Sequence, residues 1–187
     1  MRCFVERVLF VSLSILLMTP PIGGQEKGLQ SEFKYGGVAT CKPCHLVGRS
    51  GAQYKKWQAG PHAKTYGTLK TEKAIEWAKE RGIEDPQKSE KCVKCHVTAY
   101  GVEDSLKGPK LSLEEGVSCE ACHGPGSGYK KLKLMRDIYA GIVPGSKFGL
   151  VEPNEELCVT CHNEESPAFA GFNYEEMVAK ISHPVPK

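Results

Sequence analysis

The feature that most constrains this chain is the sequence Cys-x-x-Cys-His, which occurs four times within 187 residues. The four copies are Cys41, Cys44 and His45; Cys92, Cys95 and His96; Cys119, Cys122 and His123; and Cys158, Cys161 and His162. Two thiols at this spacing lie on one helical turn and can add to the two vinyl groups of a porphyrin, while the adjacent imidazole binds the iron. The motif therefore predicts four covalently bound haems c, with eight cysteine anchors and four proximal histidines.

Other uses of Cys-x-x-Cys are a zinc site, a dithiol redox pair or a disulfide framework. Each of these normally leaves some cysteine pairs without a following histidine. Here every pair is followed by one, although the chain holds only 6 histidines. This regularity favours haem attachment over the alternatives.

The ninth cysteine, Cys3, belongs to a different kind of segment. Arg2 and Arg7 precede an apolar run over residues 8–18, which is followed by Thr-Pro-Pro-Ile-Gly-Gly. The pattern is typical of a secretory signal, so we expect a signal peptide over residues 1–24 and a tetrahaem domain over 25–187. The run is shorter than the roughly 20 residues of a spanning helix. We therefore expect no transmembrane segment in the mature chain, with an uncleaved anchor as the alternative, and a periplasmic or extracellular location.

The ratio of cofactor to protein predicts close packing of the haems. A mature chain with four haems has only about 40 residues for each, so the porphyrins supply much of the core and lie near one another. The formal net charge of +3 loses its meaning once ionised haem propionates are counted. We accordingly expect redox proteins as electron donor and acceptor, and no nucleic-acid partner.

The pattern of helix signals predicts a fold that is mainly α with extensive loops and little or no sheet, as in multihaem c-type cytochromes. Thr71 caps a helix that ends at Gly82, Asn154 starts a helix leading into the fourth motif, and Asn173 caps a helix over 174–181. Turn sequences rich in glycine and proline separate these segments. The irregular spacing of the motifs argues against a repeat protein and favours one domain.

Four irons offer eight axial positions, and four histidines are proximal, so only two histidines remain. His62 follows Gly-Pro at a predicted helix start, and His183 stands at the end of a helix just before a proline. Both positions suit a fixed distal ligand. At least two haems then lack a distal histidine and are open, water-bound, or ligated by methionine or lysine. Met135 is the best thioether candidate.

At this point the chain resembles the cytochrome c-554 family of tetrahaem proteins. The resemblance is carried by the four motifs and by three segments: residues 57–64 (Trp-Gln-Ala-Gly-Pro-His-Ala-Lys), 116–126 around the third motif, and 176–180 shortly before His183. It implies a helical scaffold with stacked haem pairs. It further implies that His62 is the distal ligand of the fourth haem, that His183 serves the third, and that the haem on His96 has an open distal face.

The chain departs from the family pattern after the Gly-Pro-Gly segment at 124–126. In the family pattern a histidine a few residues later completes the first haem, whereas residues 127–135 contain none. For the haem on His45 the alternatives are Met135, a lysine, a ligand from a partner chain, or an open site.

These features lead to three hypotheses for function. The first is a periplasmic electron carrier that needs no substrate chemistry, and we identify no catalytic residues for it. The second is an enzyme that reduces nitric oxide, hydroxylamine or nitrite at the open haem on His96. The third is a subunit of a larger cytochrome assembly or oligomer in which a neighbour supplies missing ligands.

Overall fold

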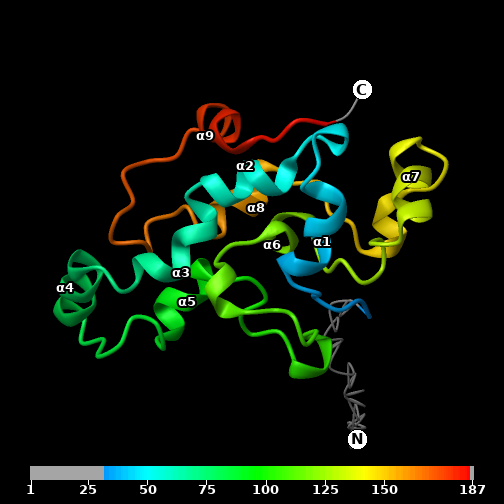
Figure 1. Cartoon of the computed structure of the whole chain (residues 1–187). Coiled ribbons are helices and arrows are strands. Elements are labelled where there is room, and N and C mark those ends of the chain that lie inside the picture. The colour runs from blue at the N-terminus through cyan, green and yellow to red at the C-terminus, as the bar shows by residue number, and fades with distance from the viewer. Residues whose placement is uncertain (1–31, 186–187) are drawn as a thin grey trace, which may run out of the picture. The chain divides into compact units, whose positions relative to one another are not determined.

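A computed structural model of the chain describes residues 32–185, which form short helices joined by loops (Figure 1). The predicted signal peptide over residues 1–24 lies outside the described residues. The α-helices are α1 (Val38–His45), α2 (Gln53–Ala59), α3 (Thr65–Thr68), α4 (Glu72–Glu80), α5 (Glu90–His96), α6 (Cys119–His123), α7 (Leu132–Tyr139), α8 (Glu155–Val159) and α9 (Tyr174–Ile181). The 3-10 helices are η1 (Gly48–Ser50), η2 (His62–Lys64), η3 (Asp104–Leu106), η4 (Leu113–Glu115) and η5 (Gly145–Phe148).

Residues 32–185 contain no sheet, which confirms the predicted fold class. The only extended pairing within this range is an isolated parallel bridge between Tyr35 and Lys107. In this bridge the Tyr35 N–H donates to the Leu106 carbonyl at 2.8 Å, and the Gly108 N–H donates to the Tyr35 carbonyl at 2.7 Å. The bridge fixes the segment just before the first motif against the loop that precedes the third.

The three helix starts predicted from the sequence are confirmed by their capping hydrogen bonds. Thr71 Oγ1 accepts from the third helical residue of α4 at 3.3 Å. The Oδ1 atoms of Asn154 and Asn173 do the same for α8 and α9, each at 3.0 Å. Each cap satisfies an N–H group that the helix itself leaves unpaired, which explains why a local signal located the helices correctly.

One detail of the sequence prediction is corrected. His183 does not end a helix, because α9 stops at Ile181 and Ser182 is extended (φ −53°, ψ 134°). The residue before a proline, here His183 before Pro184, is disfavoured in the helical conformation. The helix therefore ends early, and His183 lies on a loop. In α4, the side chain of Ile75 is 49% exposed, so this helix buries only part of its apolar residues.

The apolar core of the described residues is small. Its buried apolar side chains are Tyr54, Leu69, Ala78, Val93, Val97 and Tyr129. Leu69, Val93 and Val97 form one cluster, with Tyr66 and Cys92 packed against it. Six side chains are a small core for a unit of this size, which fits a fold in which a large apolar cofactor completes the interior.

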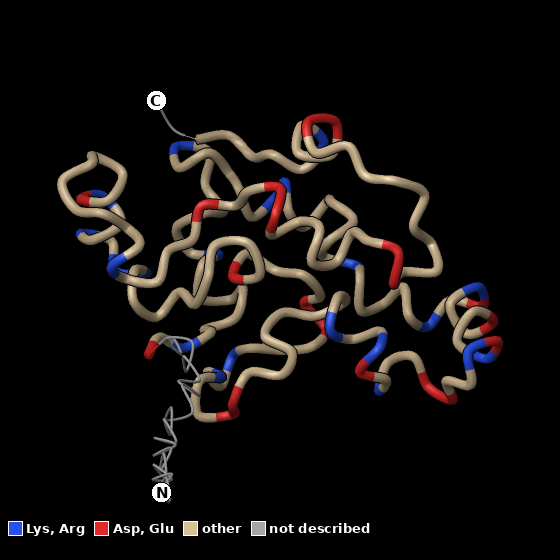
Figure 2. Tube along the Cα trace, turned by 180° about the vertical axis from the view of Figure 1, so that it is seen from behind, with Lys and Arg blue, Asp and Glu red and all other residues tan. Residues whose placement is uncertain are grey.

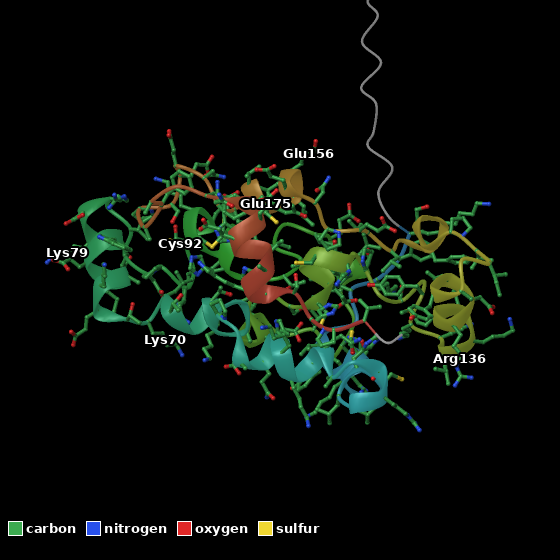
Figure 3. The ribbon with its side chains drawn as sticks, turned by 90° about the horizontal axis from the view of Figure 1, so that it is seen from above. Lys70, Lys79, Cys92, Arg136, Glu156 and Glu175 are labelled. Carbon is green, nitrogen blue, oxygen red and sulfur yellow. The ribbon has the colours of Figure 1, made fainter. Side chains whose placement is uncertain are left out.

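The helices that carry the motifs lie between two outer helices. Figure 1 shows α1, α6 and α8 in the middle, with α4 and α7 on opposite sides. Figure 3 shows the same order from above, with Lys79 on α4, Arg136 on α7, and Cys92 between them. The motif cysteines of this unit are half-buried, except for Cys44, which is exposed.

Charged side chains are spread along the chain. Figure 2 shows Lys and Arg interspersed with Asp and Glu over most of the trace. This distribution differs from the basic stripe typical of nucleic-acid-binding domains. Within residues 32–185, no helix is long and apolar enough to cross a membrane.

Candidate haem-binding site

Each of the four motifs lies on a helical turn, as the spacing predicts. The first three lie on α1, α5 and α6, and each of these helices ends at the motif histidine. In the fourth, α8 holds Cys158, and the turn continues through hydrogen bonds to the Cys158 carbonyl from Cys161 N (3.2 Å) and His162 N (3.0 Å). Two thiols and an imidazole are therefore presented on neighbouring turns at every motif, which is the arrangement that haem attachment needs.

The motif cysteines carry free thiols, and thiols of different motifs approach one another. All eight cysteines within residues 32–185 are free of disulfide bonds. Cys41 and Cys119 share a hydrogen bond, which is the main reason why the pKa of the Cys41 thiol is lowered and that of Cys119 is raised. Burial, followed by the nearby Cys161 thiol, raises the pKa of Cys95 to about 11. The first motif thus adjoins the third, and the second adjoins the fourth.

These approaches do not form a zinc site. In the described part of the chain, no group of three or more His, Cys, Asp or Glu side chains is placed to hold a bare metal ion. A structural zinc ion needs four such ligands at one point. The cysteine geometry therefore fits thioether anchors better than a metal cluster.

The two histidines outside the motifs each face a motif histidine. The ring centres of His62 and His162 are 6.0 Å apart, and those of His123 and His183 are 5.8 Å apart. With a metal–nitrogen bond of about 2.0 Å and about 1.1 Å from nitrogen to ring centre, two imidazoles on opposite sides of one metal lie about 6 Å apart. The two spacings therefore fit a pair of axial ligands, and the pairs are those that the family resemblance implies. Ligation itself stays a prediction.

The protonation of one ring in each pair also suits metal binding. Burial, followed by the neighbouring imidazole, lowers the pKa of both His62 and His123. A lowered pKa keeps the imidazole neutral, and this is the form that binds a metal. In addition, His183 Nδ1 is buried and has no hydrogen-bond partner within residues 32–185. Buried polar atoms normally have a hydrogen-bond partner, and a group bound at this position would account for the unpaired nitrogen.

The other two motif histidines are oriented by hydrogen bonds at Nδ1. His45 Nδ1 lies 3.2 Å from Gln53 Oε1, and His96 Nδ1 lies 2.8 Å from the Thr65 carbonyl. Because these oxygens only accept, each ring donates from Nδ1 and keeps Nε2 free for iron. All six histidines fall within the described residues, so no histidine remains to face His45 or His96.

Met135 lies on α7 and is half-buried. Figure 3 places its neighbour Arg136 at one end of the described unit, on the side away from Cys92. Its ligation of the iron on His45 stays a prediction.

Thr65 is a residue that the sequence analysis missed. Its Oγ1 lies 2.9 Å from the carbonyls of both His62 and His96, and it accepts from Val117 N at 3.0 Å. Trp57 Nε1 donates to the Val117 carbonyl at 2.9 Å. This one hydroxyl therefore ties a distal-ligand candidate to the second motif and to the segment before the third. A threonine in a helix gives no signal in the sequence that it has this role.

Glu120 is the second residue missed. It lies between the two cysteines of the third motif and is only 1% exposed. Its oxygens accept from the backbone N–H groups of Gly36 (2.8 Å), Gly37 (2.7 Å) and Gly126 (2.6 Å). Glu115, four residues before Cys119, accepts from Val38 N at 2.8 Å. The two carboxylates dock the start of α1 onto α6, although a glutamate in such a motif is ordinarily expected at the surface.

Comparison with known proteins agrees with this geometry. Residues 40–124, which contain the first three motifs, match the family described as "Cytochrome c554 and c-prime". Over 110 residues the chain is 34% identical to cytochrome c-554 of Nitrosomonas europaea, and the match covers 56% of this chain and 44% of that relative. The chain is thus similar to the cytochrome c-554 family over part of its length. No solved structure matches it.

This similarity supports a c-type cytochrome, in which haem c is bound covalently through Cys-x-x-Cys-His. The residues fit this cofactor, because they present free thiols, imidazoles at the right spacing and a small apolar core. The fourth motif lies beyond the matched range, and the match spans less than half the length of the Nitrosomonas relative.

Proposed function

We propose that this chain is a periplasmic tetrahaem cytochrome that passes electrons between redox proteins through four covalently bound haems. The observation that carries the proposal is the approach of the motifs to one another, with Cys41 against Cys119 and Cys95 against Cys161. Cofactors anchored at neighbouring thiols are close neighbours themselves. When bound, haem supplies one-electron chemistry that the protein's own side chains lack.

The protein's part in this function is to hold and orient the ligands. His45, His96, His123 and His162 would bind iron from one side, and His62 and His183 would close the opposite side of two of them. The Nδ1 hydrogen bonds of His45 and His96 fix the tautomer and the plane of these rings. A rigid ligand set changes little between oxidation states, which suits electron transfer.

The proposed location rests on the sequence, because haem attachment and the predicted signal peptide both require export. Fractionation of cells that express the full chain tests it, and the N-terminal sequence of the mature protein locates the cleavage site. Recovery of an uncleaved chain in the membrane fraction would support the alternative of an N-terminal anchor.

The number of haems is tested by mass spectrometry of the intact mature protein and by redox titration. We expect four haems and four electrons per chain. Replacing both cysteines of one motif by serine should remove one haem, and the motif-specific loss should appear at each of the four positions. Wild-type protein prepared in parallel is the reference, because Cys3, the one cysteine outside the motifs, belongs to the predicted signal peptide. A wild-type protein with fewer than four haems would refute the tetrahaem proposal.

A second function is favoured by one observation, namely that no histidine faces His96. An iron without a second protein ligand can bind a small molecule such as nitric oxide, hydroxylamine or nitrite. Electron paramagnetic resonance (EPR) of the reduced protein with nitric oxide tests this function. A ferrous nitrosyl signal followed by turnover would support reduction at this haem, and failure of all three ligands to reoxidise the reduced protein would exclude it.

A further inference from the structure

Two buried carboxylates connect the segments of the first and third motifs. Glu120 is 1% exposed and Glu115 is 9% exposed. Neither forms an ion pair with any of residues 32–185. Burying an unpaired carboxylate is costly, so each must be compensated by hydrogen bonds or must carry a proton.

The two carboxylates differ in how well they are satisfied. Glu120 accepts three backbone N–H bonds, which suit an acceptor-only carboxylate. Glu115 accepts one, from Val38 N to Oε2, while its Oε1 is buried and has no partner within the described residues. Glu115 therefore has an oxygen that is free to take a proton.

The surroundings of Glu115 favour its neutral form. Burial is the largest influence and raises the pKa of Glu115; the Val38 N–H opposes the rise, the neighbouring Glu120 charge adds to it, and a hydrogen bond from the Ser112 backbone opposes it, so that the pKa is raised overall. Holding a second negative charge beside Glu120 costs free energy in a medium that screens charge poorly. Protonation of Glu115 removes this cost.

The other ionisable groups around the pair do not compete for the proton. The phenols of Tyr35 and Tyr129 have pKa values raised by burial first and by Glu120 as well, so both stay protonated. The thiols of Cys41 and Cys119 feel Glu115 electrostatically, but as thioethers in the haem-bound protein they no longer titrate. These contacts also show that Glu115 lies within electrostatic range of the anchors of the first and third haems.

We propose that Glu115 is a proton-binding site that takes up one proton when the haem of the first or third motif gains one electron. Glu115 would change from carboxylate to carboxylic acid with a proton from solvent, when one electron from the donor protein reduces the haem held by the first or third motif from ferric to ferrous. On oxidation both are released. The coupling arises because reduction removes a positive charge that had favoured the ionised carboxylate, and by linkage protonation favours reduction equally. The proposal rests on the proposed electron transfer, to which it adds a proton.

The test is a potentiometric titration of the mature holoprotein between pH 5 and pH 8, with each haem followed by its absorption and EPR signals. We expect the potential of one haem to rise as the pH falls, by up to about 59 mV per pH unit, which is a tenfold change for one electron. Glu115→Gln should lose this slope. Glu115→Asp keeps a carboxyl and should retain it, as should Glu114→Gln, a matched change at the exposed neighbouring glutamate.

Infrared difference spectra between the oxidised and reduced wild-type protein give a readout that does not depend on a variant folding. Reduction should produce a carboxylic acid C=O band that shifts in D2O, and Glu115→Gln should lack it. A slope that persists in Glu115→Gln would assign the proton to the haem propionates and overturn the proposal. Reversible reduction with pH-independent potentials would overturn the proton coupling but leave electron transfer intact, whereas failure of reversible reduction would overturn both.

Discussion

Replacing Glu120 by alanine should destabilise the protein strongly, although the residue touches no predicted iron ligand. The substitution leaves the N–H groups of Gly36, Gly37 and Gly126 without their acceptor. An unsatisfied buried donor costs about 1 to 3 kcal/mol, so three cost about 3 to 9 kcal/mol. Because the Gly36 bond is only partly buried, we expect a value in the lower half of that range, about 4 kcal/mol.

A loss of this size is a large part of the 5 to 15 kcal/mol that usually stabilises a domain. In a protein of this length it should lower the melting temperature by about 8 to 16 °C. Urea and thermal unfolding of the holoprotein, followed by far-ultraviolet circular dichroism, measure both quantities. Glu114→Ala is the control at an exposed site and should change stability by less than about 0.5 kcal/mol. A loss below about 1 kcal/mol for Glu120→Ala would refute the reasoning that this carboxylate holds α1 on α6.

Three further predictions follow from the same contacts. His62→Ala and His183→Ala should each convert one low-spin ferric haem to high spin and leave the others unchanged, and an unaltered EPR spectrum in either variant would exclude that histidine as a ligand. Gln53→Leu should lower the free energy of unfolding in urea by about 1 to 2 kcal/mol, because the Gln53 amide joins the imidazole of the first motif to the carbonyl of Pro184 (3.1 Å). Gln58→Leu is an exposed change on the same helix and should lower it little. Equal losses of stability in the two variants would contradict this role of Gln53. The raised pKa of Glu115 means that the folded state holds its proton more tightly than the unfolded state, so the stability it contributes is present below about pH 4.3 and is lost as the pH rises through the folded pKa. Relative to the wild type, Glu115→Gln should therefore be more stable at pH 7 than at pH 4, and parallel pH profiles of unfolding would contradict this.

Several properties of the protein were determined by the sequence alone, because they depend on residues within one or two helical turns. The spacing of Cys-x-x-Cys-His specifies its covalent chemistry wherever the motif lies. The capping residues Thr71, Asn154 and Asn173 located three helices, since a cap acts on N–H groups two or three residues away. Counting six histidines against eight axial positions required no structure at all.

Only the tertiary structure decided which of these groups meet. His62 faces His162, and His183 faces His123, across long stretches of chain whose closure depends on every intervening turn. Glu120 carries no local sign of burial, and its three donors come from the segments at 36–37 and 126. The sequence thus determines what each motif can bind, whereas the fold determines which ligands pair and where buried charge lies, because pairing and desolvation are set by neighbours that are distant along the chain.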